Sequence, residues 1–198
     1  MIHLKQYIYE NINDNWENCV KKIGKWYQDN INDFLSYNKK NSIKSRTRKD
    51  YYCDIIKCNV KNDCIGFVMA CLKAFKVIPL EFKNIEVNDL FYDIENNGPL
   101  YKKLKDKNFE VLEYNKNILK PFDIITCNEL YEYINTDNIG TDKNNLNDNI
   151  GRQAHIEIYA GNNMSYGWGH VSNNKDGNLG LPCPMAIRKY KYIIRYNG

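Results

Sequence analysis

The chain has 198 residues, of which 43% are hydrophobic, and a formal net charge of +4. This length suits one sizeable core and leaves little room for a second, so residues 1–198 are expected to form a single domain. The densest basic stretch, residues 44–49, is predicted to be a solvated loop, and no Lys/Arg block is dense enough to indicate a nucleic-acid-binding protein.

The helices are expected in the first part of the chain. Apolar residues at helical spacing predict an amphipathic helix over residues 16–34, even with Gly24 inside it. Residues 36–50 are polar and lack an apolar rhythm, so they are predicted to be a loop. A second apolar stripe begins at Cys64 and predicts a helix that stops before Pro79.

The strands are expected later in the chain, where apolar residues alternate or run together between turn residues. Helices first and antiparallel strands later predict an α+β domain with a helical segment and loop over residues 1–50 and a core over residues 51–198. The remaining predicted elements are helical pieces at 85–92 and 101–105, strands at 109–114, 121–127 and 190–196, a loop over 135–151, and a hairpin of 155–159 with 164–168 around a Gly161-Asn162 turn.

Seven cysteines are spaced irregularly along the chain. An odd, irregular set argues against a disulfide framework and predicts synthesis in a reducing compartment. The N-terminus lacks the basic-then-apolar pattern of a secretory signal, and no apolar run approaches the length of a membrane span. We therefore expect a protein made in the cytoplasm without a signal peptide and without membrane insertion.

Cys64 is the first candidate for chemistry. It is predicted to lie in the first turn of its helix, with Asn62 or Asp63 as the N-cap. Unsatisfied amides and the helix dipole at that position lower a thiol pKa and can stabilise an oxyanion. The alternative is a buried structural thiol, because Cys64 also lies on the apolar stripe.

His155 is the matching candidate for a general base. Of the three histidines in the chain, it alone opens an alternating strand, in which Ile156 and Ile158 face one side and His155, Glu157 and Tyr159 the other. A cysteine nucleophile activated by a histidine is the usual pair in cysteine hydrolases. The alternative is a histidine at a strand end that faces solvent.

These residues resemble a known family. The order Asp63-Cys64-x-Gly66-Phe67-Val68, then Pro-x-Asp-hydrophobic at 121–125, then His155-x-x-Ile158-Tyr159-x-Gly161-Asn162 resembles the NlpC-type cell-wall peptidases, a papain-like group that cleaves peptidoglycan stem peptides. The resemblance covers about residues 50–170 and implies a papain-like NlpC-type fold, in which the nucleophile-bearing helix packs on an antiparallel sheet. It implies Cys64 as nucleophile, His155 as general base and no cofactor.

The chain departs from the family pattern at three places. Ile65 replaces the usual serine after the cysteine, and the glycine-rich stretch that follows the family tyrosine is missing after Tyr52. The residue that orients the histidine would fall at Gly167, which has no polar side chain. His170, Ser165 or a polar group elsewhere in the fold could replace it, and we favour His170.

Further residues are expected on the substrate or oxyanion side of the site: Tyr52, Asp63, Tyr166 and Trp168. Packing of the two aromatic rings in the core is the alternative for Tyr166 and Trp168. A zinc site is disfavoured because no Cys-x-x-Cys pair occurs between Cys53 and Cys71. Asp123 is expected to bond local amides rather than to act as an acid catalyst.

The motifs and the resemblance together predict a cysteine peptidase or amidase that hydrolyses peptidoglycan, either within the stem peptide or at the muramoyl-alanine bond. The peptidoglycan stem peptide is then the partner, and a phage endolysin released by a holin, or a virion-associated lysin, is the expected setting at the cell wall. The alternatives are a weak or inactive phage structural or wall-binding module with the same fold, and a protein acyltransferase or deamidase.

Overall fold

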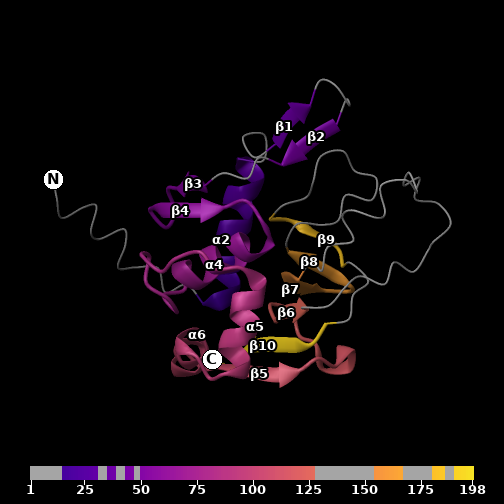
Figure 1. The fold of residues 1–198 in the computed structure, drawn as a ribbon. Helices are drawn as coiled ribbons and strands as arrows, with labels where there is room; N and C mark the ends of the chain where they lie inside the picture. Colours follow the sequence, from indigo (N-terminus) through magenta and orange to yellow (C-terminus); the bar gives the residue numbers. More distant parts are fainter. Residues whose placement is uncertain are drawn as a thin grey trace, which may run out of the picture.

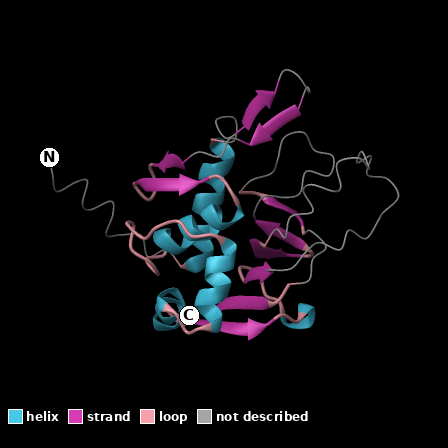
Figure 2. Ribbon diagram, viewed as in Figure 1, coloured by secondary structure: helices cyan, strands magenta, loops and turns pink. Residues whose placement is uncertain are grey.

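The computed structural model describes residues 15–30, 35–38, 43–46, 50–127, 154–166, 180–185 and 190–198. These residues form helices packed against an antiparallel sheet, with two separate hairpins (Figures 1 and 2). The predicted α+β class is therefore confirmed. None of the described helices is both long and apolar enough to cross a bilayer.

The helices follow the apolar stripes of the sequence. The first, α2 (Trp16–Asp29), begins after the Asn15 N-cap and ends five residues before the predicted end, and residues 31–34 lie outside the described part. The second, α4 (Cys64–Ala74), has the predicted bounds and is buried along most of its length. The remaining helical segments are α5 (Val87–Glu95), α6 (Pro99–Asp106) and the 3₁₀ turn η1 (Lys116–Ile118).

Six strands make up the main sheet, in the order β5-β10-β6-β7-β8-β9, and every neighbouring pair is antiparallel. The predicted hairpin is present, but its two-residue turn is Asn162–Asn163, both with positive φ, as a type I′ turn requires. The predicted loop over 135–151 lies outside the described residues. The strands are β5 (Phe109–Glu113), β6 (Ile124–Cys127), β7 (His155–Gly161), β8 (Met164–Tyr166), β9 (Pro182–Pro184) and β10 (Tyr192–Tyr196).

Two short hairpins precede α4 in the chain. One pairs β1 (Leu35–Asn38) with β2 (Ile43–Arg46), so the prediction of a loop throughout residues 36–50 is wrong in part. Backbone pairing can form a hairpin without an apolar rhythm, which is why the sequence pattern missed it. The other pairs β3 (Asp50–Cys53) with β4 (Cys58–Lys61), and β4 leads directly into α4.

The two faces of the main sheet have different partners. Ile124, Ile156 and Ile158 lie on the face that joins the main core with α2 and α4. Directly opposed residues in an antiparallel pair share a face, so His155 and Glu157 lie with their partners Cys127 and Ile125 on the other face. A smaller cluster of Ile125, Cys127, Tyr190 and Ile193 covers that second face.

Gly24 lets α2 approach the turn before β9 unusually closely. A Cβ atom on Gly24 would lie 2.4 Å from the carbonyl oxygen of Gly180, and one on Gly180 would lie 2.1 Å from the oxygen of Gly24. Gly180 also has a φ of 84°. This backbone contact explains a glycine in the interior of a helix, where it would otherwise weaken the helix.

Candidate active site

Cys64 is the first residue of α4 and is partly buried. The Asp63 carboxylate caps the helix by accepting a 2.7 Å hydrogen bond from the backbone N–H of Gly66, so the predicted N-cap is confirmed. Gly66 itself leaves no room for a side chain, because a Cβ there would lie 2.3 Å from the carbonyl oxygen of Lys61. The chain before the helix therefore folds tightly over its first turn and fixes the position of the thiol.

The structure brings Cys64 and His155 together, as the sequence predicted, by packing the start of α4 against the start of β7. His155 and the backbone of Ile156 lie near the Cys64 sulfur, and both lower its pKa. Burial raises the pKa of the Cys64 thiol, but these two groups outweigh it and leave the thiol pKa below its ordinary value. The thiolate of Cys64 therefore forms more readily than that of an ordinary cysteine.

Glu157 lies beside the histidine ring. Its Oε2 is 3.4 Å from His155 Nε2, and the side chains of Glu157 and His155 are only 2% and 7% exposed. Ser165 Oγ donates a 2.6 Å hydrogen bond to Oε2, and the Tyr190 hydroxyl donates one to Oε1. Both carboxylate oxygens of Glu157 are therefore satisfied by residues of β8 and of the segment before β10.

The charges at this site support one another. Burial lowers the pKa of His155, but Cys64 and Glu157 outweigh it and raise the pKa to about 10. Burial raises the pKa of Glu157, whereas His155, Ser165 and Tyr190 together leave it below its ordinary value. An imidazolium and a carboxylate are thus the favoured charge states at neutral pH, and the lowered pKa of Cys64 shifts its thiol toward the thiolate.

Sequence reasoning missed Glu157 as a site residue. Glu157 shares a strand face with His155, but the family pattern puts the orienting residue on the returning strand, at the position of Gly167. Ser165, one of the proposed substitutes, contacts Glu157 rather than the histidine. His170, the favoured substitute, lies outside the described residues. The two-residue spacing on β7 was the available signal.

The other predicted site residues lie in different surroundings. Tyr52 lies in β3 opposite Asn59, with 62% of its side chain exposed. Tyr166 is nearly buried and stacks on Phe122, with ring centroids 6.0 Å apart, on the core face of the sheet. Asp63 caps α4. Trp168 lies outside the described residues.

All seven cysteines are free thiols. Among the described residues, no group of three or more histidine, cysteine or acidic side chains has an arrangement that could hold a metal ion. The described groups that meet at this site are the side chains of Cys64, His155 and Glu157 and the backbone amides at the start of α4.

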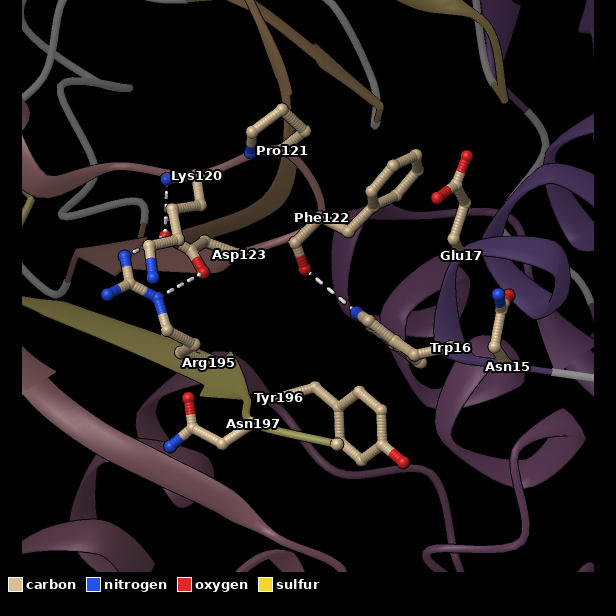
Figure 3. A pocket seen from close by; sticks show the side chains of 11 residues that line it. Asn15, Trp16, Glu17, Lys120, Pro121, Phe122, Asp123, Arg195, Tyr196 and Asn197 are labelled. Atoms are coloured by element: carbon tan, nitrogen blue, oxygen red, sulfur yellow. Dashed lines mark hydrogen bonds and ion pairs between the residues drawn. The ribbon is translucent and has the colours of Figure 1, made fainter.

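A pocket of about 410 Å³ lies at the other end of the sheet (Figure 3). One wall is an ion pair in which Arg195 donates to both oxygens of Asp123, at 2.9 and 2.6 Å. Asp123 also accepts from the backbone N–H of Lys120, so it has the structural role expected from the sequence. Trp16 donates to the carbonyl oxygen of Phe122 and ties α2 to this end of the sheet. Asp123 directly precedes Ile124 of β6, and Ile124 pairs with Ile158, which is three residues beyond His155 on β7. The pocket is therefore separate from the Cys64 thiol.

The geometry around Cys64 can perform nucleophilic acyl transfer. It offers a sulfur of lowered pKa, a histidine in contact with it, and helix amides able to bind an oxyanion. These are the parts that cleavage of an amide or ester bond requires. None of the protein-family models, curated proteins or solved structures compared with the chain matches it.

Proposed function

We propose that the protein is a cysteine hydrolase with Cys64 as nucleophile and His155 as general base. The observation that carries this proposal is the contact between the sulfur at the first turn of α4 and the imidazole at the start of β7. A structural thiol buried in the core gains nothing from a lowered pKa, and Cys71, which is fully buried on the same helix, has a raised one.

Each step of the proposed reaction has a group to carry it. His155 takes the proton of Cys64, and the thiolate attacks the carbonyl carbon while the carbonyl electrons move to oxygen, where amides of α4 stabilise the charge. The C–N bond then breaks, and the imidazolium gives its proton to the departing amine. Water attacks the resulting thioester with His155 as base, the C–S bond breaks, and the thiolate returns as the acid product leaves.

The substrate class rests on the resemblance of the motifs around Cys64 and His155 to the NlpC-type cell-wall peptidases. We propose amide bonds of bacterial peptidoglycan, in the stem peptide or between muramic acid and alanine, and a papain-like arrangement of the fold. Strand β6 between β10 and β7 and the helix-borne cysteine are compatible with that arrangement. Action at the cell wall as a phage endolysin or virion-associated lysin is part of the same proposal.

A turbidity assay tests the proposal. Wild-type protein should clear a suspension of purified Gram-positive cell walls, and Cys64→Ala should abolish clearing without unfolding the protein. Cys58→Ala is the matched control, because Cys58 is another partly exposed free thiol, located in β4. Mass analysis of the released fragments identifies the bond that is cut. Equal clearing by wild type and Cys64→Ala would refute a cysteine mechanism.

A catalytically inactive wall-binding module is the second candidate. Its motivation was the lack of a polar residue at Gly167 to orient the histidine, and the contact of Glu157 with His155 weakens that motivation. Co-sedimentation separates the two functions. If wild type and Cys64→Ala are equally inert yet both pellet with cell walls, the binding module is the better description.

A further inference from the structure

Glu157 is a buried acidic residue whose surroundings are built around it. Its Oε1 accepts from the Tyr190 hydroxyl and its Oε2 from Ser165, and the Oε2 side faces His155 Nε2 at 3.4 Å. Cys183 Sγ in turn contacts the carbonyl oxygen of Ser165 at 3.5 Å across β9. The carboxylate is therefore held by two other parts of the chain, β8 and the segment before β10, and it also lies next to the histidine.

We propose that Glu157 is the positioning residue for His155 and completes a Cys64–His155–Glu157 triad whose last two members lie two residues apart on one strand. The proposal rests on the function proposed above. It assigns to Glu157 the task that the resembling family gives to a residue further along the chain, which here would be Gly167.

The proposal also assigns the ring nitrogens. Because Glu157 Oε2 lies 3.4 Å from Nε2, the proton of the neutral ring is placed on Nε2, and Nδ1 is assigned as the nitrogen that accepts the proton of Cys64. The histidine becomes an imidazolium in every step in which it holds the cysteine or water proton. Glu157 stabilises that charged form without itself exchanging a proton.

Among the described residues, the other groups that face the ring do not supply an opposite charge of their own. Cys127 faces His155 from β6, and Asp63 at the start of α4 is engaged as the helix cap and acts only weakly on Cys64. The Tyr190 ring packs at a tilted angle on Tyr114, with centroids 5.1 Å apart, and its hydroxyl donates to Glu157. Besides the Cys64 thiolate, Glu157 is thus the anion whose interaction with the ring keeps His155 protonated up to a pKa of about 10.

The first experiment measures His155 itself and needs no variant of Glu157. In protein labelled with ¹⁵N-histidine, the signal that disappears in His155→Gln is assigned to His155. We expect a ring that stays protonated well above its ordinary pKa of about 6.5 and carries its last proton on Nε2. A ring that titrates near that ordinary value, or whose last proton is on Nδ1, would overturn the proposal.

The second experiment compares Glu157→Gln with Thr126→Val. The pH profile of Cys64 alkylation by iodoacetamide should have an alkaline step where His155 loses its proton. Glu157→Gln should move this step downward by about one to three pH units. The same substitution should slow wall clearing by at least about tenfold. Thr126→Val is the control, because the Thr126 hydroxyl donates to the backbone carbonyl of His155 at 3.0 Å and not to its ring. It should lower the urea midpoint and leave the alkylation profile in place.

The outcomes separate this inference from the function proposed above. The alkylation profile and the histidine titration need no wall substrate, so they test Glu157 even if the protein clears no walls. If wild type clears walls and Glu157→Gln does so at an equal rate with an unmoved alkaline step, the hydrolase stands and the role of Glu157 falls. A shifted profile without clearing in the wild type would support the triad and refute peptidoglycan as the substrate.

Discussion

Replacing Cys64 by alanine should change how the stability of the protein depends on pH, and the structure fixes the sign of the change. In the folded protein the pKa of Cys64 is lowered and that of His155 is raised to about 10. In the unfolded chain these groups titrate near pH 8.5 and about 6.5, respectively. The free energy of unfolding follows the difference in bound protons between the two states.

Each group contributes over its own pH range. Cys64 keeps a thiol proton only in the unfolded chain between its lowered folded-state pKa and about pH 8.5, so its contribution to stability rises with pH across that interval. His155 keeps its proton only in the folded protein between about pH 6.5 and 10, so its contribution is fully present below about pH 6.5 and is lost as pH rises through about 10.

Urea unfolding of wild type and Cys64→Ala over this pH range provides the measurement. Alanine binds no proton in either state. The rise of the free energy of unfolding with pH on the acidic side should therefore appear as a pH-dependent difference between wild type and Cys64→Ala. Cys58→Ala is the control. Burial raises the pKa of Cys58, with a smaller opposing effect of Lys73, so its thiol stays protonated in both states on the acidic side. The difference between wild type and Cys58→Ala should therefore not vary with pH there.

The refuting result is specific. If the stabilities of wild type and Cys64→Ala change in parallel at every pH below about 8.5, folding does not lower the pKa of Cys64. The argument for an activated nucleophile would then fail, whatever the two side chains' proximity.

Three further predictions concern the thiol, the helix cap and the α2 contact. Iodoacetamide at about pH 6 should alkylate Cys64 faster than Cys58, as peptide mass analysis will show, because only Cys64 has a lowered pKa. Asp63→Ala should lower the free energy of unfolding by about 1 kcal/mol, whereas Asp63→Asn should keep most of the cap, and equal losses in urea titrations would contradict this role. Gly24→Ala should destabilise by about 1–3 kcal/mol despite the better helix propensity of alanine, because its Cβ would meet the Gly180 carbonyl, and a raised melting temperature would argue against that contact.

Elements with a clear apolar period could be predicted from the sequence. The stripe from Cys64 gives α4 its bounds, and the alternation after His155 gives β7, because burial of one face imposes these periods on the chain. The hairpin of β1 and β2 and the short strand β9 could not be predicted in this way. Two of the three residues of β9 are prolines, and its pairing at the sheet edge depends on β8 being present beside it.

The close contact of α2 with the turn before β9 shows a second limit of sequence reasoning. In the sequence alone, Gly24 is an unfavourable residue inside an amphipathic helix. Its neighbours along the chain do not indicate that contact with Gly180 requires a glycine there. The two glycines are far apart in sequence, and each makes room for the backbone of the other. A single sequence records the glycine but not the partner that requires it.

At the candidate site, the spacing on the strand indicates Glu157 as the partner of His155, whereas the family pattern indicates the position of Gly167. Cys64 and His155 could be predicted because each starts an element whose period marks it. Glu157 was equally visible, since residues two apart on a strand point to the same face, and a buried carboxylate next to a buried histidine demands an explanation. Its donors could not be predicted, because Ser165 and Tyr190 reach it only after β8 and the segment before β10 are in place. The fold adds to the sequence the hydrogen bonds that keep this carboxylate charged beside the ring. The ionisation of His155 depends on that charge, and the reactivity of Cys64 depends in turn on His155.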